Sequence, residues 1–496
     1  MTDADVVVVG GGPVGLMTAC ELALGGVRPV ILERLAEPTG HDRAGVLHTR
    51  TVETLAARGL FARFREGNDI TEGLPFAGIF STGIVHEHLD TRHKFSLLVP
   101  QSQTERLLTD RAAELGVEIR RGHEVTGLAQ NADEVTAEVT GPDGTYQFRG
   151  RYLVGCDGGR SSVRRLADMG FRGVEASVSA LIGYATCQEK NLPMKWERAK
   201  GGIIVLGFPP EGGIGRVVTM EYNRPDVDRD APATLTELRE AVHRVTGREV
   251  PLTEPVLWLS RFSDRSGHAE HYRRGRVFVA GDASHVHFPI GGQGLNTGLQ
   301  DAVNLGWKLA GRIHGWASEA VLDSYQRERQ PVAQRVLMNT RAQLALMNPD
   351  EQHTTPLRTL VEELLGIEEV NRHLIAMITG TDIRYDLGET APDHPLAGRF
   401  APDLPLKTAD GEVLVSRLLS SGRGVLLDLA GREDLRPLAQ DRQDRVEVVA
   451  AHTDEPAPAA ALLIRPDGYC AWATDSRERS VDDRDALREA IVHWFG

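Results

Sequence analysis

The first residues that could do chemistry in this chain form a glycine-rich turn near its N-terminus. An apolar run, residues 6–9, is followed directly by Gly-Gly-Gly-Pro-Val-Gly, which is a Gly-x-Gly-x-x-Gly pattern. In such a pattern Gly10 makes the tight turn, Gly12 lets the backbone approach a pyrophosphate, and Gly15 lets the next helix pack closely on the strand. We therefore expect a helix that starts near Pro13 and binds a dinucleotide pyrophosphate at its N-terminus.

An acidic residue stands where a nucleotide ribose is usually bound in such a site. The apolar segment 30–32 ends at Glu33, about twenty residues after the glycines. A carboxylate there accepts hydrogen bonds from a ribose diol and disfavours a 2′-phosphate. Strand, glycines, helix and acid together predict a Rossmann-like nucleotide site, which NAD and FAD would fit equally well.

Two later segments indicate which dinucleotide is bound. Cys-Asp-Gly-Gly-Arg at 156–160 follows an apolar run and precedes several arginines, and Asp157 with these arginines suits a second pyrophosphate. Taken alone, that segment fits an ordinary Asp-Gly turn and a solvated helix face at least as well. Further on, Gly-Asp-Ala-Ser-His at 281–285 leads to Pro-Ile-Gly-Gly-Gln-Gly-Leu-Asn at 289–296, and this last motif favours FAD.

The three motifs stand in one order, and this order resembles the single-component flavoprotein aromatic hydroxylases, the group that contains para-hydroxybenzoate hydroxylase. The closer likeness is to the actinobacterial enzymes that oxygenate polycyclic aromatic polyketides and to the rifampicin monooxygenases. It covers nearly the whole chain, including segments 99–105, 120–125 and 304–309. The resemblance implies non-covalent FAD, with NADPH or NADH as a transient co-substrate.

The resemblance also implies where the adenosine and phosphate parts of FAD would lie. Glu33, with Arg34 beside it, would bind the adenosine ribose. Arg43 and Gln101 would lie against the phosphates and the ribityl chain, and Val125 would offer backbone groups near the adenine.

The last motif would hold the other end of FAD. By the same resemblance Asp282 would bind the ribityl and phosphate region, and the turn 289–296 would border the isoalloxazine ring. The backbone amides of Leu295 and Asn296 would face the flavin pyrimidine edge, where a helix N-terminus favours the negative charge of reduced flavin. The predicted FAD-binding residues are Gly10, Gly12, Pro13, Gly15, Glu33, Arg34, Arg43, Gln101, Val125, Asp157, Gly281, Asp282, Pro289, Gly292, Gly294, Leu295 and Asn296.

The expected reaction is the hydroxylation of a polycyclic aromatic polyketide in antibiotic or secondary-metabolite biosynthesis. NAD(P)H would reduce FAD, and the reduced flavin would react with O₂ to give a flavin C(4a)-hydroperoxide. The protein would exclude water so that this peroxide is not lost as H₂O₂. Because no second Gly-x-Gly-x-x-Gly follows a strand, we expect no separate nicotinamide domain. The sequence names no catalytic base, since tyrosines such as Tyr184 and Tyr222 are expected to be core residues.

Two alternatives remain open. One is a Baeyer–Villiger or rifampicin-type antibiotic-inactivating monooxygenase on the same scaffold. The other is a catalytically idle FAD-binding partner protein.

Composition limits the partners and the compartment. The net charge of −14 argues against nucleic-acid and anionic-membrane partners, which call for a basic surface. No signal peptide is visible, and the four cysteines, Cys20, Cys156, Cys187 and Cys470, form no Cys-x-x-Cys. We therefore expect a cytoplasmic protein without disulfides. We also expect it to be a monomer or a homodimer. No metal site is predicted, because His285 and His287 have no third ligand at metal spacing.

The 496 residues are too many for one domain. We expect a mixed α/β chain with a Rossmann-like FAD-binding domain in two parts, 1–175 and 269–390, and an inserted antiparallel substrate-binding sheet at 176–268. A proline-rich passage from Ala391 would lead to a thioredoxin-like domain at 397–496 that lacks the redox Cys-x-x-Cys.

Overall fold

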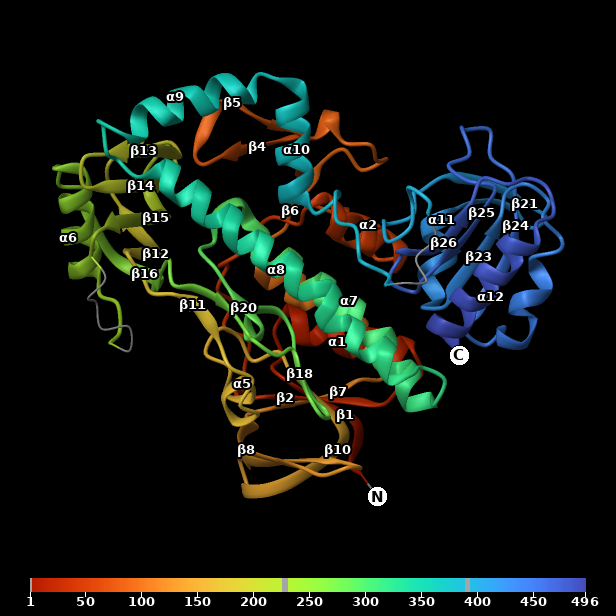
Figure 1. The fold of residues 1–496 in the computed structure, drawn as a ribbon. Helices are drawn as coiled ribbons and strands as arrows, with labels where there is room; N and C mark the ends of the chain where they lie inside the picture. The colour runs from red at the N-terminus through yellow and green to blue at the C-terminus, as the bar shows by residue number, and fades with distance from the viewer. Residues whose placement is uncertain (1, 225–230, 389–392) are drawn as a thin grey trace.

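The computed structural model describes residues 2–224, 231–388 and 393–496, and it confirms a mixed α/β fold. In Figure 1 the largest sheet lies at the bottom of the view, a second sheet at the left and a third at the right. Residues 391 and 392 of the predicted proline-rich passage lie outside the described residues.

The largest sheet follows the strand order β18-β19-β10-β1-β2-β7, with an antiparallel excursion through β8 and β9. Strand β1 pairs in parallel with β2 and β10, and its valines are buried, as expected for a strand covered on both faces. Helix α1 starts and ends where its proline and paired glycines predict. The elements up to the inserted sheet are β1 (Ala4–Val9), α1 (Pro13–Leu24), β2 (Pro29–Glu33), α2 (Thr49–Ala57), α3 (Phe61–Arg65), β3 (Asp69–Thr71), β4 (Gly73–Phe76), β5 (Ile79–Val85), β6 (Ser96–Leu98), α4 (Gln101–Glu114), β7 (Glu118–Arg121), β8 (Glu124–Gln130), β9 (Val135–Gly141), β10 (Gly144–Gly155) and α5 (Ser162–Leu166).

The second sheet is five-stranded and antiparallel, in the order β13-β14-β15-β12-β16. Alternate residues of these strands point to opposite faces, and helix α6 covers one face through an apolar cluster that includes Leu181, Val217 and Val242. The elements of this sheet and its helix are β12 (Val178–Cys187), β13 (Lys195–Ala199), β14 (Gly202–Gly207), β15 (Gly213–Tyr222), α6 (Leu235–Thr246) and β16 (Leu252–Ser263). On either side of it in the chain, β11 (Arg172–Val174) and β17 (Ser266–His268) pair in a small separate sheet with β20 (His285–Val286).

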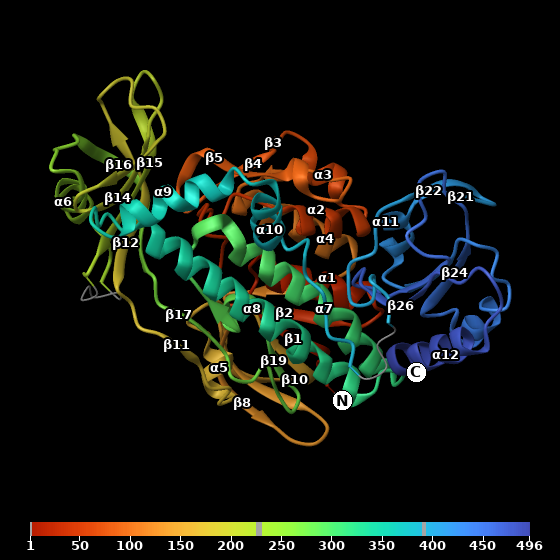
Figure 2. The same cartoon turned by 45° about the horizontal axis from the view of Figure 1, so that its top comes forward.

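Two long helices connect the sheets. Helix α7 packs on α1 beside the largest sheet, and α8 runs from the neighbourhood of the third sheet to the second sheet in both views (Figures 1 and 2). Helices α9 and α10 then return along the second sheet and the β4–β5 hairpin. The elements are β18 (Arg273–Arg274), β19 (Val277–Val279), β20 (His285–Val286), α7 (Gln293–His314), α8 (Glu319–Met347), α9 (Thr354–Leu365) and α10 (Glu368–Thr379).

The third sheet forms a C-terminal unit with the order β24-β23-β25-β26. Strands β23 and β24 are parallel, β25 and β26 are antiparallel to their neighbours, and the last helix packs on β26. That this unit is thioredoxin-like stays a prediction. Burial raises the pKa of Cys470 to about 12, so its thiol stays protonated. The elements are β21 (Pro405–Thr408), β22 (Gly411–Leu414), α11 (Val415–Leu418), β23 (Gly424–Asp428), β24 (Val446–Ala450), β25 (Ala461–Ile464), β26 (Cys470–Thr474) and α12 (Val481–Phe495).

Candidate flavin site

The fold brings the three glycine motifs together. A Cβ atom placed on Gly10 would lie 2.5 Å from the carbonyl oxygen of Cys156, in the second motif. A Cβ on Gly281, in the third motif, would lie 2.8 Å from Cγ2 of Val14 in the first. Only glycine allows these approaches, and Gly10 and Gly281 also have positive φ angles of 109° and 62°. The three turns therefore meet at the carboxyl ends of β1, β10 and β19 in the largest sheet.

The N-terminus of α1 is open to a ligand. Its N-cap residue Gly12 offers no side-chain cap, and a Cβ on Gly12 would meet nothing within 4 Å. The N–H groups of the first turn of a helix have no partner in the helix, and they carry the positive end of its dipole. A pyrophosphate fits this cradle because it would satisfy these donors.

The predicted ribose ligand lies in front of the same turn. Glu33 Oε2 accepts a hydrogen bond of 2.6 Å from the backbone N–H of Gly11, and Oε1 accepts one of 2.8 Å from Leu35. The carboxylate is therefore fixed at the end of β2. Arg34 and Arg43, which follow Glu33 in the chain, are exposed. Their contacts with FAD stay predictions.

The start of α4 lies against the segment that follows Arg43. Gln101 Oε1 accepts a hydrogen bond of 3.3 Å from the N–H of Ala44, and Gln101 Nε2 donates to Glu105. Val125 lies in β8 and its side chain is buried, so only its backbone N–H and C=O groups could contact a ligand.

Asp157 caps a helix, which the sequence analysis did not predict. Its carboxylate accepts hydrogen bonds from the N–H groups of Ser162 at 2.6 Å and Val163 at 3.1 Å, at the start of α5. Arg164 donates to the carbonyl oxygen of Ala283 at 2.7 Å and so links the second motif to the third. These contacts explain both residues without a pyrophosphate, and the FAD contact of Asp157 stays a prediction.

Around Asp282 the structure leaves polar atoms without partners. Asp282 is exposed, and a Cβ on Gly294 would lie 3.9 Å from its carboxylate and 3.4 Å from Nε2 of His287. That Nε2 atom is buried and has no hydrogen bond within the described residues, while Nδ1 of the same ring contacts the carbonyl oxygen of Phe288 at 2.9 Å. Gly292, the N-cap of α7, again offers no side-chain cap. A ligand with polar atoms fits here.

Asn296 has a second role that only the structure reveals. Its Oδ1 accepts a hydrogen bond of 2.7 Å from the N–H of His48, and its Nδ2 donates to the carbonyl oxygen of Val46 at 3.0 Å. His48 Nε2 in turn contacts the carbonyl oxygen of Gly291 at 2.7 Å. His48 thus ties α2 to the turn 289–296, and no sequence motif pointed to it.

Acid is expected to weaken this tie. Burial lowers the pKa of His48 from its ordinary value of 6.5 to about 4, so the folded state holds the ring neutral. The unfolded state binds more protons between these two values, and stability is therefore lost as the pH falls from about 6.5 to about 4. The shift corresponds to about 3 kcal/mol.

The measurement is urea unfolding of the apoprotein at several pH values. We expect His48→Gln to remove part of the loss of stability between pH 6.5 and pH 4. His243→Gln, on the exposed side of α6, is the control and should keep the parent profile. Identical profiles for all three proteins would contradict the assignment.

On the side away from α6, part of the second sheet is covered by α8, α9 and α10. Next to this covered part lies a set of half-buried side chains, which we call the open face. It consists of the half-buried residues Ile182, Tyr184, Arg216, Trp258 and Ser260. At one end of the face the ring of Trp258 stacks on His41 at 5.2 Å between centroids. At the other end Phe262 lies 5.3 Å from Phe288, just before the turn 289–296.

Two residues of this region differ from the sequence-based expectation. Tyr222 was expected in the core but is half-buried; it packs against the apolar cluster, its hydroxyl donates to the carbonyl oxygen of Leu344 at 2.9 Å, and burial raises its pKa. For Tyr184 the expectation was wrong, because it lies half-buried on the open face, 5.8 Å from Trp258. Sequence reasoning also missed Arg216, whose side chain has no ion pair or hydrogen bond within the described part of the chain.

The residues that the structure describes contain no group of three His, Cys, Asp or Glu side chains placed to bind a metal. His285 instead contacts Asp301 at 2.7 Å. Burial raises the pKa of Cys20 and of Cys156 to about 12. In the same described ranges, every helix is too short or too polar to cross a membrane.

Comparison with known proteins agrees with this site. Residues 3–340 match the family model described as FAD binding domain, and residues 394–496 match the one described as aromatic-ring hydroxylase, C-terminal. The chain is 46% identical to the 12-dehydrotetracycline 5-monooxygenase/anhydrotetracycline 6-monooxygenase of Streptomyces rimosus subsp. rimosus, over 99% of both chains. It is 45% identical to a rifampicin monooxygenase of Streptomyces venezuelae, over 99% of this chain and 98% of that protein.

A solved structure, that of an anhydrotetracycline hydroxylase from Streptomyces rimosus, has a TM-score of 0.91 and 44% identity, with 99% of each chain covered. The expected resemblance, the cofactor FAD and the enzyme class are thereby confirmed. The chain belongs to the FAD-binding aromatic-ring hydroxylases, and it is a flavoprotein monooxygenase.

Proposed function

We propose that this monooxygenase hydroxylates a polycyclic aromatic polyketide, with FAD bound non-covalently and with NADPH or NADH and O₂ as co-substrates. The observation that carries the proposal is the position of the open face, which reaches the flavin-site segments through Trp258 on His41 and Phe262 on Phe288. A relative named as an anhydrotetracycline 6-monooxygenase supports this class of substrate.

FAD, when bound, supplies the redox and oxygen-transfer chemistry. The residues of the chain hold and orient it. We propose that the N-terminus of α1 binds the pyrophosphate, that Glu33 binds the ribose, and that Asp282 with the first residues of α7 binds the ribityl and pyrimidine parts. The unsatisfied N–H groups at both helix starts support this assignment.

The open face would bind the substrate. Tyr184 and Trp258 offer ring surfaces on which a planar polycycle can stack. Arg216 carries the positive charge of this face, and a nearby cation favours an ionised phenol over a neutral one. An ionised phenol makes the ring richer in electrons, which assists transfer of an electrophilic oxygen.

Arg216→Met is expected to raise the KM for a phenolic polycycle by about tenfold, since a hydrogen bond to a charged group is worth about 1.5–3 kcal/mol. The bound phenol should also ionise at higher pH, seen as a shift in its absorbance titration. Arg239→Met is the control, because Arg239 donates to the carbonyl oxygen of Leu252 beside α6. An unchanged KM in Arg216→Met would contradict its role.

The decisive experiment is incubation of the FAD-loaded protein with NADPH, ¹⁸O₂ and an aromatic tetracyclic polyketide. We expect NADPH consumption that depends on substrate and a product that gains one labelled oxygen as a hydroxyl group, identified by mass and NMR. A ring-inserted ester oxygen would favour the Baeyer–Villiger alternative. A rifamycin as the only oxidised substrate would favour the antibiotic-inactivating alternative, and no NADPH consumption at all would favour an idle FAD-binding partner.

The remaining features of the proposal concern the setting of the enzyme. We propose that it works in the cytoplasm as a monomer or homodimer. We also propose that it has no nucleic-acid or membrane partner, and the net charge of −14 supports this second statement. We also propose the division into an FAD-binding domain at 1–175 and 269–390, a substrate-binding sheet at 176–268 and a C-terminal domain at 397–496.

A further inference from the structure

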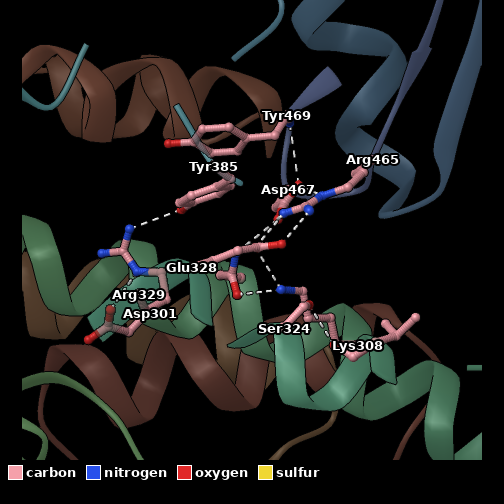
Figure 3. Close-up of polar contacts among 11 residues, drawn as sticks. Asp301, Lys308, Ser324, Glu328, Arg329, Tyr385, Arg465, Asp467 and Tyr469 are labelled. Carbon is pink, nitrogen blue, oxygen red and sulfur yellow. Dashed lines mark hydrogen bonds and ion pairs between the residues drawn. The ribbon is translucent and has the colours of Figure 1, made fainter. Parts of the chain in front are cut away.

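A cluster of six charged side chains is buried between the C-terminal unit and the FAD-binding part of the chain (Figure 3). Each of these side chains is at most 1% exposed. Three are basic and three are acidic, so their formal charges cancel. The members are Asp301 and Lys308 on α7, Glu328 and Arg329 on α8, and Arg465 and Asp467 in the turn between β25 and β26.

One end of the cluster holds the turn that contains Asp282. Asp301 Oδ2 accepts a hydrogen bond of 3.0 Å from the backbone N–H of Gly281 and lies 2.7 Å from Nε2 of His285. These two contacts fix the residues on both sides of Asp282. Asp301 itself is fully buried, so its carboxylate is not available to FAD and acts on the turn alone.

Arg329 connects Asp301 to two other elements. Its Nε donates to Asp301 Oδ1 at 2.7 Å, and its Nη2 donates to the carbonyl oxygen of Thr297 at 3.1 Å, in the second turn of α7. Its Nη1 donates to the hydroxyl of Tyr385 at 2.9 Å. One guanidinium group therefore binds the Gly-Asp turn through Asp301, the N-terminal part of α7, and the segment after α10.

The C-terminal unit supports the far side of this arrangement. The ring of Tyr385 lies 4.1 Å, between centroids, from the ring of Tyr469. Tyr469 follows the turn whose Arg465 donates to both carboxylate oxygens of Glu328, at 2.7 and 2.8 Å. Glu328 is the neighbour of Arg329 in α8, so the C-terminal unit reaches Arg329 from two directions.

We propose that the C-terminal unit sets the affinity for FAD by positioning the turn 281–285, with Tyr385, Arg329 and Asp301 as its positioning residues. None of these three is a catalytic residue, because each acts on the turn through Gly281 and His285. The inference rests on the proposed contact of Asp282 with FAD. It gives the C-terminal unit, which holds no redox cysteine pair, a function in cofactor binding.

The test is the dissociation constant of FAD, measured by fluorescence titration of the folded apoprotein without substrate or NADPH. Tyr385→Phe removes one hydroxyl and leaves an N–H of Arg329 unpaired, and we expect FAD binding to weaken by about fivefold. Asp301→Asn removes the charge that attracts Arg329, and we expect a loss of about tenfold or more. The visible circular dichroism of bound flavin should change in both variants.

Tyr222→Phe is the matched control, because it removes a part-buried hydroxyl that donates to the carbonyl oxygen of Leu344 in α8 and not to a residue that holds the turn 281–285. It should lose a similar amount of thermal stability and keep the parent affinity for FAD. If Tyr385→Phe also keeps the parent affinity and flavin spectrum, the C-terminal unit has only a structural role and the proposal is overturned. Normal FAD behaviour in a protein that fails to oxidise any polycycle would contradict the proposed function instead.

Discussion

Gly15→Ala is expected to weaken FAD binding by about a hundredfold and to destabilise the apoprotein. A Cβ atom at position 15 would overlap the carbonyl oxygen of Gly10, so backbone on both sides of the turn must move. Overpacking of this kind costs about 1–3 kcal/mol, and a clash with backbone belongs at the upper end. The same displacement moves the N–H groups that we propose to bind the pyrophosphate, and about 3 kcal/mol of lost binding corresponds to about a hundredfold weaker affinity.

Gly12→Ala provides the contrast. A Cβ there meets nothing within 4 Å, so the apoprotein should keep the thermal stability of the parent. The methyl group would stand where we expect the pyrophosphate, and FAD should bind more weakly. Thermal unfolding of both apoproteins and FAD titrations separate the two effects. Parent-like FAD affinity in Gly12→Ala would show that the pyrophosphate lies elsewhere.

Arg465→Met is expected to destabilise the protein by about 3–5 kcal/mol, because it breaks a buried ion pair and leaves charges without compensation. The cluster would keep Lys308 and Arg329 against three carboxylates. Arg423→Met is the control in the same unit, since the Arg423 to Glu447 pair is more than one-third exposed. Loss of such a surface pair costs less than about 1 kcal/mol. Denaturant unfolding measures both values.

A double variant tests whether charge balance is the cause. Arg465→Met with Asp467→Asn leaves two basic and two acidic groups in the cluster, and part of the lost stability should return. If the double variant is no more stable than Arg465→Met alone, packing of the arginine stem rather than its charge explains the loss. Arg465 lies against the rings of Trp494 and Tyr385, which makes that comparison necessary.

The sequence by itself determined the features that depend on residues close together in the chain. The bounds of α1 follow from Pro13 at its start and the glycines after Leu24, and strands of the second sheet follow from short apolar and alternating runs. The order of the three glycine motifs was enough to identify the family and FAD, because each motif is a local backbone requirement.

The tertiary structure decided which side chains the ligand can reach. Asp157 looks equally suited to a phosphate site and to a turn, and its cap on α5 becomes visible only when Ser162 and Val163 are placed. Asn296 and His48 meet across 248 positions of sequence, which no local pattern encodes. Tyr184 was expected in the core, yet it lies half-buried beyond the part of its face that α8, α9 and α10 cover.

The buried charge cluster is the clearest case of a feature that only the tertiary structure decides. Arg465, Pro466, Asp467 and Gly468 have the composition of an exposed turn, since such residues favour turns and are usually solvated. Burial of their charges becomes favourable only because Glu328 lies 137 positions away in sequence and 2.7 Å away in space. Local sequence therefore determines the turn, whereas its insertion beside the FAD-binding helices depends on partners that folding alone brings together.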